Sequence, residues 1–371
     1  MMTLPHVQHS KGRAPCPPST QTRKCPFLGF PAPTGLVAVF FTCALAFPPV
    51  LVQGGEIGHF NGGFLNIRDY LMPEQGLYGA IYNYYYTTNQ LNDHGGDKVT
   101  SVTVNPGGGQ GLTLGADISV DMYAVAPTLI YVTDANAIGI KYGGLVSPTF
   151  ANASLEAALS IASRSGGKVE SSTFSMGDLF VQPVWLGKTL DHWDFALAYG
   201  FYAPIGKYNT ETLPLPGGAS VRTEAKDNIG FGFWTHQFQG SAAWYPWADK
   251  RMAVVSTLTY EIHGEKEDFD LTPGENLTFN WGISQYLPLR EDNSLLLEIG
   301  LAGYHGWQVA DDSGRDAVDQ DVHDQVHAVG VQLGLALLPW QTVLTLHGFY
   351  EYEAKDRFQG QSYSLSLSKK F

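Results

Sequence analysis

Apolar and polar residues alternate strictly over the last ten residues of the chain, SYSLSLSKKF (362–371). One side carries Tyr363, Leu365, Leu367 and Phe371, whereas serines dominate the other side. Successive side chains of a strand point to opposite faces, so this period of two predicts a half-buried strand. Its apolar face would meet a core in a soluble protein, or lipid in an outer-membrane barrel with a polar lumen.

Strand-like segments of this kind recur along the chain, and we count twelve of them from Gly76 onward. The face opposite the apolar one carries small, uncharged residues more often than charged ones. A narrow barrel lumen favours that choice, because bulky residues would collide there. The predicted strands lie at 76–87, 116–132, 138–153, 177–187, 192–206, 232–246, 252–264, 277–287, 294–309, 325–337, 342–353 and 360–371.

The connections between these segments alternate between long and short. Outer-membrane barrels join an even number of strands by short periplasmic turns and longer outer loops. The pattern therefore predicts an all-β fold, a transmembrane antiparallel barrel of about 12 strands over 76–371. The expected outer loops lie near 88–115, 154–176, 207–231, 265–276 and 310–324, and the expected turns near 133–137, 188–191, 247–251, 288–293 and 338–341.

The last strand is expected to close the barrel against the first, which leaves no open edge in lipid. Its terminal Phe371 resembles the signal read by the bacterial barrel-assembly machinery, which we expect as a partner. Lys369 departs from that pattern, although a lysine near the interface can extend its amine into water. Outer-membrane lipid and lipopolysaccharide are the other expected partners.

Composition agrees with a barrel but also fits a secreted β-sandwich. Charged residues make up only 15% of the chain, against roughly a quarter in an average soluble domain. Aromatic residues reach 13%, and there are 42 glycines. A soluble exported β-protein therefore stays open as an alternative on composition alone.

Residues 1–54 are expected to be a leader and signal peptide that is removed. Basic residues precede the apolar run LVAVFFTCALA (36–46), which is too short to span a membrane as a helix. Cys16, Cys25 and Cys43 all lie in this segment, so the remaining chain would hold no disulfide or thiolate.

Removal of residues 1–55 would take away four Lys/Arg and no Asp/Glu, which leaves 18 − 35 = −17. Nucleic acid needs a basic surface, so no nucleic-acid partner is expected. The acidic stretch DDSGRDAVDQDVHD (311–324) is expected to be a solvated loop, or a divalent-cation contact to lipopolysaccharide phosphates.

Five segments carry a resemblance to a known family: 76–99, 121–134, 177–208, 232–246 and 276–287, together with the ending LSLSKKF. The chain resembles the outer-membrane proteins named for the meta-pathway of phenol degradation. The resemblance implies a transporter-like barrel for uptake of aromatic or other hydrophobic compounds in Gram-negative bacteria. It implies no enzyme activity and supplies no agreed site residues.

Several polar and aromatic side chains are predicted to line the solute path. In YNYYY (82–86), Tyr82, Tyr84 and Tyr86 are expected in an interfacial belt. That would turn Asn83 and Tyr85 inward, where they could meet an aromatic solute. Ionisable groups on lumen positions would tune selectivity or pair with Arg or Lys as struts. These groups are Asp121, Asp194, Glu261, Glu298, His347 and Glu351.

Residues 55–75 form an apolar stretch ahead of the first strand, and such a stretch should not hang freely in the periplasm. We expect it to fold into the lumen as a plug, with a plain linker as the alternative. The side chains placed near the solute path are Phe64, Ile67, Tyr70 and Leu71.

The sequence thus predicts an outer-membrane channel that takes up small hydrophobic or aromatic solutes by facilitated diffusion. G-x-S-x-G, GxxxxGK[ST] and HExxH do not occur, and we expect no catalytic residues, metal or cofactor. A general diffusion porin for hydrophilic solutes is the main alternative. An outer-membrane barrel enzyme is a weaker one.

Overall fold

The computed structural model describes residues 57–104, 112–137, 139–161, 164–214, 220–225, 227–317 and 320–371. The predicted leader and signal peptide lie outside the described residues. These described residues contain fifteen strands, and thirteen of them form one sheet. Twelve of these thirteen form the barrel, because β2 (Ser101–Val104) pairs only with β3 and extends it at one end. Among the described residues, no helix is long and apolar enough to cross a membrane.

The barrel is antiparallel throughout, and β1 closes it by pairing with both β15 and β3. This arrangement confirms the predicted twelve-stranded closed barrel. The barrel strands are β1 (Gly76–Thr88), β3 (Leu112–Ala137), β4 (Ile140–Ile161), β5 (Arg164–Thr189), β6 (Trp193–Ala203), β9 (Thr235–Trp244), β10 (Met252–His263), β11 (Asn276–Pro288), β12 (Leu295–Gln308), β13 (Gln325–Leu337), β14 (Thr342–Lys355) and β15 (Gln361–Lys370).

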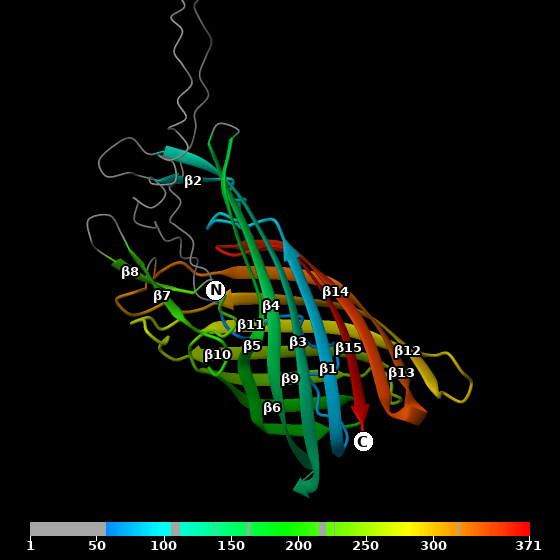
Figure 1. Cartoon of the computed structure of the whole chain (residues 1–371). Helices are drawn as coiled ribbons and strands as arrows, with labels where there is room; N and C mark the ends of the chain where they lie inside the picture. The colour runs from blue at the N-terminus through cyan, green and yellow to red at the C-terminus, as the bar shows by residue number, and fades with distance from the viewer. Residues whose placement is uncertain are drawn as a thin grey trace, which may run out of the picture.

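The two ends of the barrel differ as the sequence predicts. The short connections gather at one end, the turn end, where η1 (Leu338–Trp340) joins β13 to β14. The longer connections gather at the other, the loop end, where β7 (Thr210–Pro214) and β8 (Ser220–Glu224) form a hairpin. Figure 1 shows β3, β4 and β5 rising well beyond the other strands at the loop end.

One predicted outer loop is wrong. Residues 154–176 are not a loop, because β4 continues to Ile161 and β5 begins at Arg164. The two strands pair with each other over this stretch, from Ser154–Ser172 to Ile161–Arg164. Weakly patterned residues therefore take strand structure here because each strand supplies hydrogen-bond partners to the other.

Side chains alternate between the outer surface and the lumen. On β15, Tyr363 and Leu365 are 49% and 47% exposed, whereas Ser362 and Ser364 are each 2% exposed. The large outward residues continue around the barrel, for example Leu197 on β6 and Val331 on β13. A closed barrel with an apolar exterior satisfies its backbone groups internally, as hydrocarbon requires. The chain is thus a closed antiparallel β-barrel with the apolar outer surface that a membrane requires.

The barrel wall is less regular on one side. The ladder between β3 and β4 passes from the pair Val125–Phe150 to the pair Leu129–Val146, and Pro127 and Pro148 lie in or beside that gap. The β4–β5 register shifts between Pro148 and Phe150, and the β5–β6 register shifts between Val181 and Val184, beside Pro183. Proline cannot donate to a ladder, which accounts for the position of these interruptions. We call β3–β6 the interrupted wall.

The remaining strands, β9–β15 and β1, form what we call the continuous wall. Their ladders run without a register shift from β9 to β13, and again from β14 through β15 to β1. The ladder between β13 and β14 has one shift, between His327 and Ala328.

Candidate functional site

Residues 57–75, which we call the lumen segment, run down the inside of the barrel from the loop end to the turn end. At the loop end, His59 Nδ1 lies 2.7 Å from Oγ1 of Thr235, the first residue of β9. At the turn end, the Tyr78 hydroxyl donates to the carbonyl oxygen of Glu74 over 2.7 Å. The segment therefore traverses the depth of the lumen.

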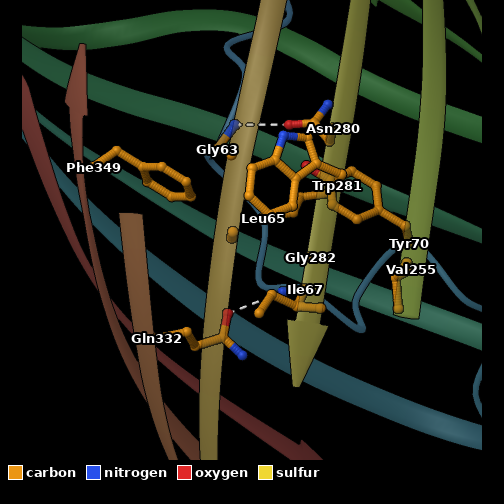
Figure 2. Close-up of a pocket in the computed structure, with 12 residues that line it drawn as sticks. Gly63, Leu65, Ile67, Tyr70, Val255, Asn280, Trp281, Gly282, Gln332 and Phe349 are labelled. Atoms are coloured by element: carbon orange, nitrogen blue, oxygen red, sulfur yellow. Dashed lines mark hydrogen bonds between the residues drawn. The ribbon is translucent and has the colours of Figure 1, made fainter. Parts of the chain in front are cut away.

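The upper half of the lumen segment bonds to the wall through its backbone. The Phe60 amide donates to both carboxylate oxygens of Glu261, at 3.0 and 3.1 Å. The Gly63 amide donates to Asn280 Oδ1 over 3.0 Å, as Figure 2 shows. Glu261 and Asn280 are 1% and 5% exposed, so these buried acceptors depend on the segment for their partners.

The lower half adds a charged contact. Arg68 Nε donates to Glu298 Oε1 over 3.1 Å, and the Glu298 side chain is 3% exposed. The same guanidinium donates to the backbone oxygens of Lys250 and Arg251, so it links the segment to a turn. The amide of Ile67 donates to Gln332 Oε1 over 3.0 Å (Figure 2). A buried pair of this kind costs several kcal/mol if one partner is removed.

Glycines of the wall make room for the segment. A Cβ at Gly282 or Gly300 would come within 2.7 or 2.4 Å of Ile67, and a Cβ at Gly187 within 2.6 Å of Met72. The small residues on the inner face thus accommodate a second piece of chain. One cavity beside Ile67 and Tyr70 has a volume of only about 20 Å³, room for about one water molecule.

Six of the ten predicted path residues lie together inside the barrel. Phe64 packs against Tyr82 and Tyr84, and Tyr70 is 4% exposed. Glu351 accepts hydrogen bonds from the hydroxyls of Tyr86 and Tyr304, at 2.9 and 2.8 Å. The other three, Glu261, Glu298 and His347, each bond to the lumen segment.

Asp194 also lies on the inner side, but at the turn end. It pairs with Lys250 Nζ over 2.9 Å and accepts from the Tyr245 hydroxyl over 2.6 Å. The pairs Asp194–Lys250 and Glu298–Arg68 are struts, one of the two roles expected for the inward carboxylates.

The predicted inward orientation of Asn83, Tyr85 and Asp121 is wrong. Tyr85 is 40% exposed on the outer surface, where its hydroxyl donates to Asp121 over 2.7 Å. Asn83 is bonded to the Tyr123 hydroxyl on the same surface. Large residues occupy both faces of β1, so periodicity alone does not tell which face meets lipid.

The tyrosines expected in the interfacial belt point inward instead. Tyr82 and Tyr84 are 5% and 2% exposed. The Tyr82 hydroxyl donates to Asp69, and the Tyr84 hydroxyl accepts from Asn61, so each tyrosine finds a polar partner on the lumen segment.

Sequence reasoning missed His59 and Asp178. His59 Nε2 lies 2.9 Å from Asp178 Oδ2, and both side chains are nearly fully buried. Burial lowers the pKa of His59, against the opposing effect of the Asp178 carboxylate. The two residues lie 119 positions apart in sequence, and no local pattern signals their contact.

Asp178, His59 and Thr235 have the order of carboxylate, imidazole and hydroxyl found in hydrolases. Thr235 is 0% exposed, and its hydroxyl bonds to His59 on one side and to His263 on the other. A substrate carbonyl has no approach to that oxygen in this arrangement. Among the described residues, no group of three or more His, Cys, Asp or Glu could hold a metal ion.

Comparison with solved structures supports the fold. The chain is similar to an outer-membrane channel from Pseudomonas putida F1, with 15% identity, a TM-score of 0.59, and coverage of 83% of this chain and 100% of that one. Weaker likenesses are to a TodX mutant and to CymD, both described as monoaromatic hydrocarbon channels. Their identity is 11% each, with TM-scores of 0.40 and 0.38. They cover 89% and 85% of this chain and 98% and 95% of their own.

No curated protein matches the chain. A family model described as "Putative MetA-pathway of phenol degradation" matches residues 88–367, well over half of the 371 residues. The match covers every barrel strand from β3 to β14 and most of β15. The chain therefore belongs to this family of outer-membrane β-barrel proteins.

Proposed function

We propose that this barrel is an uptake channel for small hydrophobic or aromatic compounds, and that the lumen segment is its gate. The observation that carries the proposal is the occupied lumen. The segment bonds to inward residues of β1, β5 and every strand from β9 to β15. A steadily open, water-filled pore is incompatible with that arrangement, so solute passage requires movement of the segment.

The interrupted wall is the proposed way out for an apolar solute. The β4–β5 ladder breaks between Pro148 and Phe150, directly opposite Gly177 and Asp178. Side chains bridge the neighbouring β3–β4 gap, where the Thr128 and Ser147 hydroxyls are 2.8 Å apart. A local gap bridged by one such bond parts at lower cost than an unbroken stretch of ladder. A solute leaving there would enter the hydrocarbon of the membrane and avoid the polar lower lumen.

A diffusion porin for hydrophilic solutes is the second candidate. The polar inner face favours it, because Ser362, Ser364 and Ser366 are each at most 3% exposed and face the lumen. If the segment left the barrel entirely, these serines would line an aqueous bore. Steady ion conductance by the intact chain would support this candidate.

No enzymatic role is proposed. Lipid on the outer surface, lipopolysaccharide at the loop end and recognition of Phe371 by the assembly machinery stay predictions of the sequence.

The test is uptake by cells that lack the gene and by complemented cells, with labelled toluene, phenol and a hydrophilic sugar as probes. We expect complementation to restore aromatic uptake and to leave sugar uptake unchanged. Equal gains for the sugar and the aromatics would favour the diffusion porin, and no gain for any probe would contradict a channel function.

A further inference from the structure

His59 occupies a box of aromatic rings at the loop end of the barrel. Its imidazole stacks on Tyr202 with ring centroids 4.6 Å apart and an interplanar angle of 21°. Phe231 lies 4.5 Å away, and Phe233 meets the imidazole edge-on at 5.0 Å. Three rings at such distances enclose one flat aromatic group.

Polar groups mark two edges of the same box. Asp178 Oδ2 lies 2.9 Å from His59 Nε2, and Thr235 Oγ1 lies 2.7 Å from His59 Nδ1. The Thr235 hydroxyl is in turn 2.8 Å from His263 Nδ1, which fixes its position. The box therefore offers a carboxylate acceptor at one edge of the ring and a hydroxyl at another.

The walls of the box do not depend on the lumen segment. Asp178 is held by the backbone amides of Gly206 and Phe231, at 3.0 and 2.8 Å. Tyr202 stands on β6 and packs against Phe180 of β5, with centroids 4.5 Å apart. The box would keep its shape if His59 withdrew, because its parts are fixed by β5, β6, β9 and the loop before β9.

The box adjoins the interrupted wall. Gly177 and Asp178 fall in the β4–β5 break, where no ladder pair joins them to β4. A molecule bound in place of His59 would thus sit between the mouth of the barrel and the proposed exit.

From this geometry we infer that the box is a binding site for a neutral monoaromatic solute with a hydroxyl or amino donor on its ring. The His59 imidazole fills the same space and therefore competes with the solute for the box. The inference rests on the proposed function and names the solute class of that channel. The donor bonds to Asp178, and the ring fills the space between Tyr202, Phe231 and Phe233. An aromatic carboxylate is disfavoured, because its charge would face that of Asp178.

The test compares purified wild-type protein with His59→Ala, with folding checked by heat-modifiable gel migration. The probes are phenol, imidazole, toluene and benzoate, measured by calorimetric titration. Removal of an internal competitor raises the fraction of competent sites, so we expect phenol and imidazole to bind at least about tenfold tighter to the variant. Benzoate should gain nothing.

Two further variants keep the inference open to refutation. Ile67→Ala enlarges a cavity elsewhere on the same segment, beside Gly282 and Gly300, which has aromatic residues but no carboxylate among its lining residues. Asp178→Asn in the His59→Ala background removes the charge but keeps an acceptor for the Gly206 amide. We expect no gain in phenol binding for Ile67→Ala, and loss of the preference for phenol over toluene for the double variant.

Equal phenol gains in Ile67→Ala and His59→Ala would overturn the inference, and so would benzoate binding as tight as that of phenol. These results leave the channel proposal intact if complemented cells still take up aromatics. Conversely, absence of uptake in cells with a normal binding result would contradict the channel and not the box.

Discussion

The continuous and interrupted walls differ both in their ladders and in what they hold. The lumen segment bonds to all eight strands of the continuous wall, from Thr235 on β9 to Tyr84 on β1. Among the described residues, its side-chain bonding to the interrupted wall is limited to the contact between His59 and Asp178. One side of the barrel thus anchors the segment, and the other has the weaker strand pairing. In the proposed function, the continuous wall holds the gate and the interrupted wall provides the solute exit.

The largest effect is expected from removal of the anchored element. Deletion of residues 58–72 leaves the barrel strands complete and takes away the bonds that close the lumen. We expect single-channel conductance in planar bilayers to change from brief or absent events to a steady open level. Unchanged conductance in the deletion variant would show that the segment does not close the pore.

The second largest effect is expected from loss of one partner of the buried pair between Arg68 and Glu298. Arg68→Ala leaves Glu298 buried without its cation, which costs roughly 3–5 kcal/mol in such pairs. Most of that cost falls on the docked state, so open events should become far more frequent. Glu298→Gln combined with Arg68→Ala should recover part of the closed state, because no uncompensated charge remains.

Gly300 allows a test of how closely the lumen segment fits against the continuous wall. Gly300→Ala would place a methyl group 2.4 Å from Ile67 Cδ1. Overpacking of this kind costs typically about 1–3 kcal/mol, so the segment should dock less firmly and proteolysis of the segment should quicken. The matched control is Gly240→Ala, where an added Cβ would have only Leu197 Cδ2 nearby, at 3.6 Å. Equal protease sensitivity of the two variants would show that the space beside Gly300 does not matter for docking of the segment.

The interrupted wall can be tested by restoring a backbone donor. Pro148→Val supplies an amide at the β4–β5 break and should tighten the wall there by about 1 kcal/mol, the usual net value of a hydrogen bond. We expect aromatic uptake to fall several-fold. The same substitution made in the 58–72 deletion variant should leave its single-channel conductance unchanged. Unchanged uptake would argue against an exit through this wall.

The smallest effect is expected from pH. Burial lowers the pKa of His59, so the docked state binds its proton less readily than the released one. Docking is therefore favoured at neutral pH and weakens as the pH falls below the usual value of about 6.5. One group changes the equilibrium by at most about tenfold per pH unit. Opening should rise modestly between pH 7.5 and 5.5, and His59→Gln should remove that part of the dependence.

The sequence predicts those features that depend on local periodicity. Leu365 and Ser364 identify the two faces of β15 because one face is uniformly apolar and the other uniformly small. On β1 both faces carry large residues, and only tertiary contacts with Asp69 and Asn61 turn Tyr82 and Tyr84 inward. The sequence does not predict the long β4–β5 hairpin, because its residues alternate weakly and its two strands are held by backbone pairing with each other.

The candidate site is less accessible from sequence for the same reason. Glu261, Glu298 and His347 were found because a charge on a lumen position stands out in a strand. Asp178 and His59 were not found, since the contact between them joins a barrel strand to a segment with no regular structure of its own. Ladder interruptions at Pro127, Pro148 and Pro183 become visible only when the four strands β3–β6 stand side by side.

Cross-linking the lumen segment to the continuous wall tests the central claim most directly. A Cβ at residue 282 would lie 2.7 and 2.8 Å from the two γ carbons of Ile67, close enough for a disulfide between Ile67→Cys and Gly282→Cys. Cysteines occur only at positions 16, 25 and 43, so residues 55–371 carry none to compete. We predict that oxidised cells lose aromatic uptake, that a reductant restores it, and that neither single-cysteine variant responds. Full uptake through the cross-linked barrel would contradict the account.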